Sequence, residues 1–150
     1  MEKIVFDSGV KEYQINDDGV LRFNPTDPNV YNRFFMASEK IKAVEDRLVA
    51  RGAAVGEDGQ KAIEVLAEAD RDTKAILAEV FGEGNDFDKM LGGVNMMAVG
   101  DNGERIITNF LHALTPIMQD GAERCMAQDS AAAVEQAKAN RAQRRAAERK

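Results

Sequence analysis

Residues 28–51 read PNVYNRFFMASEKIKAVEDRLVAR, and this segment gives the clearest structural signal in the chain. Apolar or small side chains recur there in steps of four and three, at Val30, Phe34, Ala37, Ile41, Val44 and Leu48. That spacing places all of them on one face of an α-helix. Thr26 or Asp27 can cap the start of the helix, and Gly52 predicts its end. We therefore expect a long amphipathic helix whose apolar face packs on a core.

The same spacing predicts a second helix after the connector at residues 56–59. Its face is formed by Ile63, Leu66, Asp70, Thr73, Leu77 and Val80, and Val65 and Ile76 broaden it. Because Asp70 and Thr73 are polar, we expect this face to turn toward solvent at these two positions. A hydrogen-bonded polar pair in the core is the alternative.

A last helix is predicted from about Glu104, after a short helical turn over residues 86–91. Its apolar face comprises Ile106, Phe110, Ala113, Leu114, Ile117, Gly121 and Cys125. Pro116 lies inside this helix and predicts a kink, because the carbonyl of His112 loses its hydrogen-bond partner. Beyond Ser130 the chain has high helix propensity but almost no large apolar residue, so a frayed or mobile helix is expected there.

The first 24 residues show the period-two alternation of β-strands. Three apolar pairs alternate with polar residues between glycine-containing turns: Ile4 and Phe6, Tyr13 and Ile15, and Leu21 and Phe23. They predict a three-stranded antiparallel meander, which must pack its apolar face on another element. The predicted fold class is therefore α+β, mostly α. The meander (1–24) packs on a bundle of about three long helices (25–129) in one domain, and residues 130–150 form a basic tail that is helical or mobile.

The charge of the chain is divided unevenly. The 150 residues (16.5 kDa) carry a formal net charge of −6. Residues 138–150 contain six basic residues and one acid, a net +5, which leaves −11 on the first 137 residues. An acidic body argues against a general nucleic-acid-binding domain, whose affinity depends on many phosphate contacts. The tail itself remains open to three interpretations: a solvated helix end, a contact with an acidic protein surface, or a local contact with nucleic acid.

The sequence predicts no catalytic, cofactor-binding or metal site, and we expect a protein that is not an enzyme. His112 is the single histidine and Cys125 the single cysteine, and their separation along one helix does not place them on the same face. The acids Glu83, Asp86 and Asp88 lack the order of ligands of a calcium-binding loop, so turn and cap chemistry explains them more simply. One cysteine, with neither a secretory signal nor an apolar membrane span, predicts a soluble protein of a reducing cytoplasm.

Two groups of residues are candidates for binding a partner. The first is the methionine group Met90, Met96 and Met97, whose flexible side chains suit either core filling or an adaptable binding surface. The second is the group of tail arginines, Arg141, Arg144 and Arg145, which can contact an acidic surface.

The order of motifs resembles a family of small bacteriophage and prophage tail proteins. A short meander contains KEY at residues 11–13, a helical hairpin ends in VFGEG at 80–84, MLGG follows at 90–93, and a last helix leads to NRAQRR at 140–145. In this order the chain is similar to the tail assembly chaperones of long-tailed phages, which are encoded near the tape measure protein.

The resemblance implies a non-enzymatic role in the cytoplasm of a bacterial host. Proteins of this family are thought to bind the long tape measure protein and to help deliver tail tube subunits around it, and some are also made in a longer, frameshifted form. The implied partners are the tape measure protein, the tail tube and further copies of the chain, with no membrane. Two alternatives remain: a structural component of the tail tube or connector in the virion, and a small nucleic-acid-binding regulator that acts through the basic tail.

Overall fold

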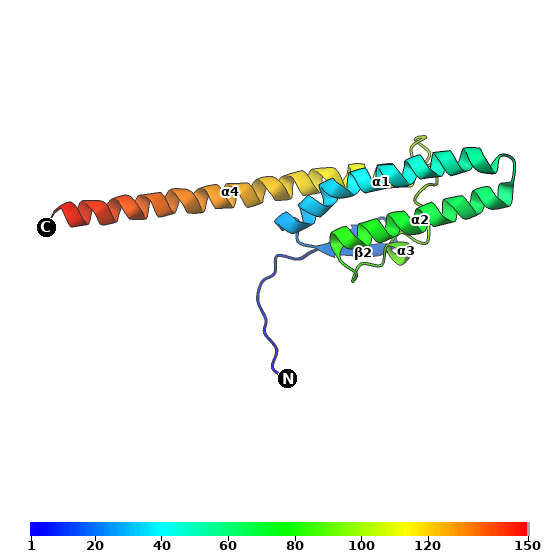
Figure 1. Ribbon diagram of the computed structural model, residues 1–150. Helices are drawn as coiled ribbons and strands as arrows, with labels where there is room; N and C mark the ends of the chain where they lie inside the picture. Colours follow the sequence, from blue (N-terminus) through cyan, green and yellow to red (C-terminus); the bar gives the residue numbers. More distant parts are fainter. Residues whose placement is uncertain (150) are drawn as a thin grey trace.

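The computed structural model describes residues 1–149 and shows a mostly helical chain with one β-hairpin (Figure 1). Its elements are β1 (Lys11–Ile15), β2 (Gly19–Phe23), α1 (Pro28–Val55), α2 (Gly59–Phe81), α3 (Phe87–Met90) and α4 (Ile106–Glu148). The predicted class, α+β with mostly helical content, is confirmed. Lys150, the last residue of the predicted tail, lies outside the described residues.

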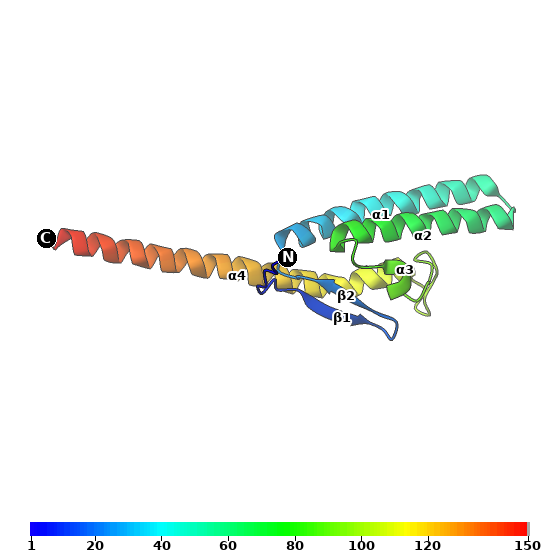
Figure 2. The same ribbon diagram turned by 90° about the horizontal axis from the view of Figure 1, so that it is seen from below.

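α1 packs along α2 as an antiparallel pair, which both views show (Figures 1 and 2). The side chain of Asp27 caps α1 by accepting a hydrogen bond from the Asn29 N–H at 2.9 Å. The buried residues of α1 are the six that the spacing predicted. The predicted end at Gly52 is wrong, because the helix continues to Val55. The left-handed turn occurs at Gly56, where φ is +59°.

The buried face of α2 is rotated from the predicted one. It comprises Val65, Ala69, Thr73, Lys74, Leu77, Val80 and Phe81, whereas Ile63 is 69% exposed. Thr73 is fully buried, so the expectation that α2 turns toward solvent there is wrong. The physical reason is that Asp88 of α3 and the Met96 N–H provide partners for Lys74 and Asp70, which allows this face to pack inward. The Thr73 hydroxyl has no hydrogen-bond partner, so Asp70 and Thr73 do not form the hydrogen-bonded pair of the alternative.

The sheet consists of β1 and β2, paired antiparallel with Lys11 opposite Phe23 and Ile15 opposite Gly19. Leu21 and Phe23 point into the core, and Tyr13 stacks on Phe23 with ring centroids 5.1 Å apart. The ring of Phe23 packs on the buried ring of Phe81, which in turn packs on Phe87. The hairpin therefore packs through one apolar face, as a small sheet requires.

The predicted third strand is absent from the described part of the chain, because residues 1–10 form no strand. The Nδ2 of Asn24 donates a hydrogen bond to the Ser8 carbonyl at 3.0 Å, and Gly9, with φ +71°, lies against the same side chain. Asn24 follows β2, so these contacts hold the chain at the β2 side of the hairpin. The segment then leaves the body instead of folding back along β1 (Figure 1).

α4 crosses the body and continues far beyond it (Figure 2). It is fixed at Gly121, where an added Cβ would lie 1.8 Å from the carbonyl oxygen of Pro25. The helix continues through Pro116 as one element. From residue 126 to residue 149 every position is exposed. The predicted tail is thus helical up to Glu148.

Candidate functional site

An apolar groove lies between β1 and the first half of α4. Its volume is about 390 Å³, and its lining residues are Tyr13, Gln14, Ile15, Asn16, Leu91, Ile106, Asn109, Phe110, Ala113, Leu114 and Ile117. All of these side chains are uncharged. A second hollow of about 410 Å³ shares Tyr13 and Ile117 with the first and extends it to Lys11 at the start of β1. The two hollows, together called the β1–α4 groove below, accompany the whole length of β1.

The groove exists because much of the predicted apolar face of α4 is not buried. The buried residues of α4 are Ile107, Leu114, Met118 and Gly121. Ile106, Phe110 and Ile117 are only partly buried and Ala113 is exposed, although the spacing placed all four on the core face. The folded chain therefore lacks a covering for part of this face. Such a surface is typical of a site that binds another polypeptide.

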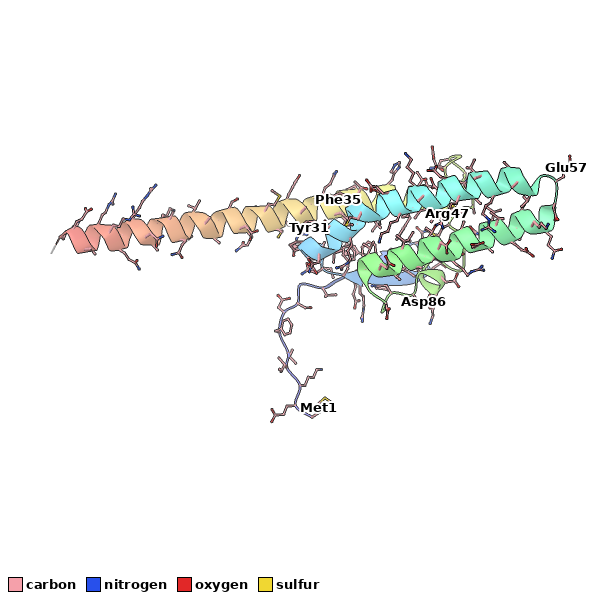
Figure 3. The ribbon with its side chains drawn as sticks, in the orientation of Figure 1. Met1, Tyr31, Phe35, Arg47, Glu57 and Asp86 are labelled. Atoms are coloured by element: carbon pink, nitrogen blue, oxygen red, sulfur yellow. The ribbon has the colours of Figure 1, made fainter. Side chains whose placement is uncertain are left out.

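The tail arginines project from the exposed part of α4. Arg141, Arg144 and Arg145 are exposed, and the helix from residue 126 to Glu148 is roughly 35 Å long at 1.5 Å per residue. At its base, Tyr31 of α1 and Cys125 of α4 lie near each other. The neighbouring Cys125 thiol, together with partial burial, raises the pKa of Tyr31. Figure 3 shows Tyr31 and Phe35 near the start of α1, where α4 passes.

The predicted methionine group lies in the core. Met90, Met96 and Met97 are 4%, 0% and 2% exposed, so in this structure they fill space between the helices and form no binding surface. This is the core-filling alternative of the two that the sequence allowed. A partner could reach them only after the chain opened locally. The methionines and the tail arginines therefore do not belong to one site.

Lys74 is the centre of the most strongly connected polar network. Its Nζ donates to Asp70 Oδ2 at 2.9 Å, to Asp88 Oδ1 at 2.7 Å and to the Val94 carbonyl at 2.8 Å. Burial alone lowers the pKa of Lys74, but the hydrogen bonds to Asp88 and Asp70 outweigh it, so this pKa lies above its ordinary value. All three ammonium protons have partners, and a charged amine is neither a nucleophile nor a base. The network therefore ties α2 to the loop after α3.

The other residues that could support chemistry are separated. His112 is exposed, and its separation from Cys125 along α4 is roughly 20 Å at 1.5 Å per residue, too far for a catalytic pair. The side chain of Asp86 caps α3 by accepting from the Lys89 N–H, which confirms the predicted cap chemistry. Within the described part of the chain, no three His, Cys, Asp or Glu side chains gather where they could share a metal ion.

Two important residues were not singled out by the sequence reasoning. Lys74 was missed although its spacing from Asp70, four residues apart on a helix, is visible in the sequence. Asn85 is buried, and its side-chain amide accepts from the Arg22 N–H at 2.9 Å and donates to the Arg22 carbonyl at 3.0 Å. It thereby occupies the edge of β2 that faces away from β1. No local pattern indicated this long-range contact.

Comparison of the chain with protein-family models, with curated proteins and with solved structures finds no match. Of the helices formed by residues 1–149, none combines the length and the apolar character that crossing a bilayer requires. The candidate site is therefore defined by the geometry of the chain itself: the β1–α4 groove, whose larger lining set is uncharged and whose extension carries Lys11, Asp120 and Arg124, the exposed N-terminal segment and the projecting basic helix.

Proposed function

We propose that this protein is a phage tail assembly chaperone, a non-enzymatic protein of the host bacterial cytoplasm that self-associates and binds the tape measure protein, the tail tube subunits, or both. The observation that carries the proposal is the projecting end of α4, in which every residue from 126 to 149 is exposed. A helix that extends so far from its own core has its surface available for other polypeptides.

The distribution of charge and the resemblance of the motifs support the same function. The tail arginines lie near the C-terminal end of α4, whereas residues 1–137 carry a net charge of −11. Opposite charges at two ends suit an assembly factor, because they steer partners to different surfaces and disfavour partners of like charge. Two of the sequence motifs that resemble tail assembly chaperones lie at helix ends: residues 80–84 span the end of α2, and residues 90–93 span the end of α3.

Co-purification tests the proposal directly. The tagged chain is co-expressed with the tape measure protein and the tail tube protein encoded in the same genome, and the complex is measured by pull-down and light scattering. We expect a soluble complex that is weakened when the tail arginines are replaced in R141E/R144E/R145E. The matched control is K42E/K61E/R71E, which makes the same charge change at exposed positions of α1 and α2. Failure of both tail proteins to bind the wild-type chain would contradict the proposal.

Mass spectrometry of purified particles separates this function from that of a virion component. A chaperone leaves before assembly ends, so finished tails should lack the chain. Stoichiometric presence in finished tails would instead establish a structural protein of the tail tube or connector.

A further inference from the structure

One edge of the β-hairpin carries unpaired backbone groups. The N–H and the carbonyl of Arg22 bind Asn85, so they point away from β1. Glu12 lies opposite Arg22, so the two residues form a non-hydrogen-bonded pair of the antiparallel ladder. In such a pair the backbone N–H and carbonyl groups of both residues point away from the partner strand. Glu12 and, two residues on, Gln14 therefore present donors and acceptors at the free edge of β1. Asn85 closes the β2 edge, whereas no strand of the described chain closes this one.

A segment with the pattern of a strand lies unused in the same chain. Ile4, Val5 and Phe6 are 87%, 78% and 76% exposed, which is unusual for three consecutive large apolar residues. Residues 2–6 alternate, with Ile4 and Phe6 on one side and Lys3 and Val5 on the other. In Figure 3 the chain leads away from the body to Met1, so this segment contacts little of its own fold.

The groove and the free edge are two parts of one surface. Lys11, Tyr13 and Ile15 share one face of β1, and each of them lines the β1–α4 groove. A strand added at the free edge would extend this face of the sheet over the groove. Every second side chain of the added strand would then enter the apolar space beside Phe110 and Ile117.

We propose that residues 2–6 of one copy pair with the free edge of β1 in a second copy. The pairing is antiparallel, with Ile4 opposite Tyr13 and Val5 opposite Glu12. In this register Ile4 and Phe6 enter the β1–α4 groove, while Val5 faces the exposed side of the sheet. The backbone groups of Glu12 and Gln14 receive the partners that the single copy does not give them.

A second copy is favoured over the same chain and over an unrelated partner. The contacts of Asn24 with Ser8 and Gly9 direct the segment away from the free edge of its own β1. Each copy offers one strand and one edge, so the exchange can be reciprocal and close as a two-fold dimer in which the β1 edges of both copies are covered. The inference deepens, and rests on, the self-association in the proposed function. Assembly through another surface would overturn the exchange and leave that function standing.

Cysteine cross-linking tests the register in the full chain, with Cys125→Ser in every variant. A tagged copy with Val5→Cys is mixed with an untagged copy with Glu12→Cys, and the pair is oxidised. We expect a covalent heterodimer, because residues opposite each other in a sheet lie within disulfide range. Gln14→Cys in place of Glu12→Cys is the matched control, two residues out of register on the same face, and should cross-link several-fold less. Equal cross-linking at both positions would overturn the register.

The double variant V5C/E12C in one chain tests whether the pairing occurs between two copies or within one copy. Exchange predicts a covalent dimer, whereas a hairpin closed within one copy gives a monomer with an internal disulfide and overturns the proposal.

Sedimentation of I4S/F6S against V5S adds a measurement without cross-links. I4S/F6S should weaken the wild-type dimer by at least about tenfold, since it removes the apolar groups that enter the groove. V5S should change the dimer constant much less. A monomeric wild-type chain, or equal effects of both variants, would overturn the exchange.

Discussion

Gly121 provides a quantitative test of how α4 is positioned. In Gly121→Ala the new Cβ would lie 1.8 Å from the Pro25 carbonyl oxygen and 2.6 Å from its carbonyl carbon. Both are backbone atoms, so no side-chain rotation relieves the clash. The helix and the Pro25 segment must separate by roughly 1.5 Å to reach ordinary contact. Overpacking of this kind costs about 3 kcal/mol of folding free energy at the upper end of its range.

The helix propensity of alanine offsets part of this cost. Replacing glycine by alanine inside a helix stabilises by about 1 kcal/mol, so the net loss for Gly121→Ala is about 2 kcal/mol. Gly52→Ala is the matched control, because Gly52 also lies inside a helix but an added Cβ there meets nothing within 4 Å. The control should gain about 1 kcal/mol. The same substitution therefore has opposite signs at the two sites.

Urea unfolding followed by far-UV circular dichroism measures both effects. All variants are compared at one protein concentration, because self-association adds to the apparent stability. The midpoint should fall for Gly121→Ala and rise for Gly52→Ala, with little change in the slope. If Gly121→Ala is as stable as Gly52→Ala, α4 does not pack on Pro25 as described, and the position of the β1–α4 groove is wrong.

Three further predictions follow from the contacts of single residues. Lys74→Met should cost about 3 kcal/mol, because it leaves the Asp70 carboxylate, which is only 15% exposed, without its cation. The folded state raises the pKa of Lys74, so the contribution of Lys74 to the free energy of unfolding is complete below its ordinary pKa of about 10.4 and is lost as the pH rises through the raised pKa. The urea midpoint of the wild-type chain should therefore fall at alkaline pH, and that of Lys74→Met should lack this decline. Asn85→Ala should cost about 1–3 kcal/mol and speed hydrogen exchange at the Arg22 amide, whose partner is removed. Deleting residues 126–150 should reduce the helical signal but leave the urea midpoint unchanged, since residues 126–149 are exposed; a lowered midpoint would show that the projecting helix stabilises the body.

The helices were predictable where their apolar spacing matched their burial, as in α1. The spacing of α2 was misleading because two of its polar residues, Asp70 and Lys74, bind distant groups. Asp70 accepts a hydrogen bond from the Met96 N–H at 2.8 Å, and Lys74 reaches the Val94 carbonyl. These contacts join residues 26 and 20 positions apart, and a helical repeat carries no information about them.

The candidate site was less predictable because the same pattern serves several structures. The alternation of Ile4 and Phe6 favours a strand, but it does not say whether the strand pairs with its own β1 or with another chain. The apolar spacing of α4 likewise does not distinguish a face buried in the core from a face that lines a groove, as Phe110 and Ile117 do. The motifs that resemble tail assembly chaperones suggested a protein-binding function, and the structure adds surfaces that such a function can use.

Hydrogen exchange at Glu12 and Gln14 tests most directly the claim that other polypeptides cover the free edge of β1. The amides of both residues point to solvent in the single chain and acquire partners only when a strand is added. We predict that their exchange is fast in dilute protein and slows by at least about tenfold as the concentration rises through the dimer range. Fast exchange at both amides at every concentration, in protein that is demonstrably associated, would contradict the account.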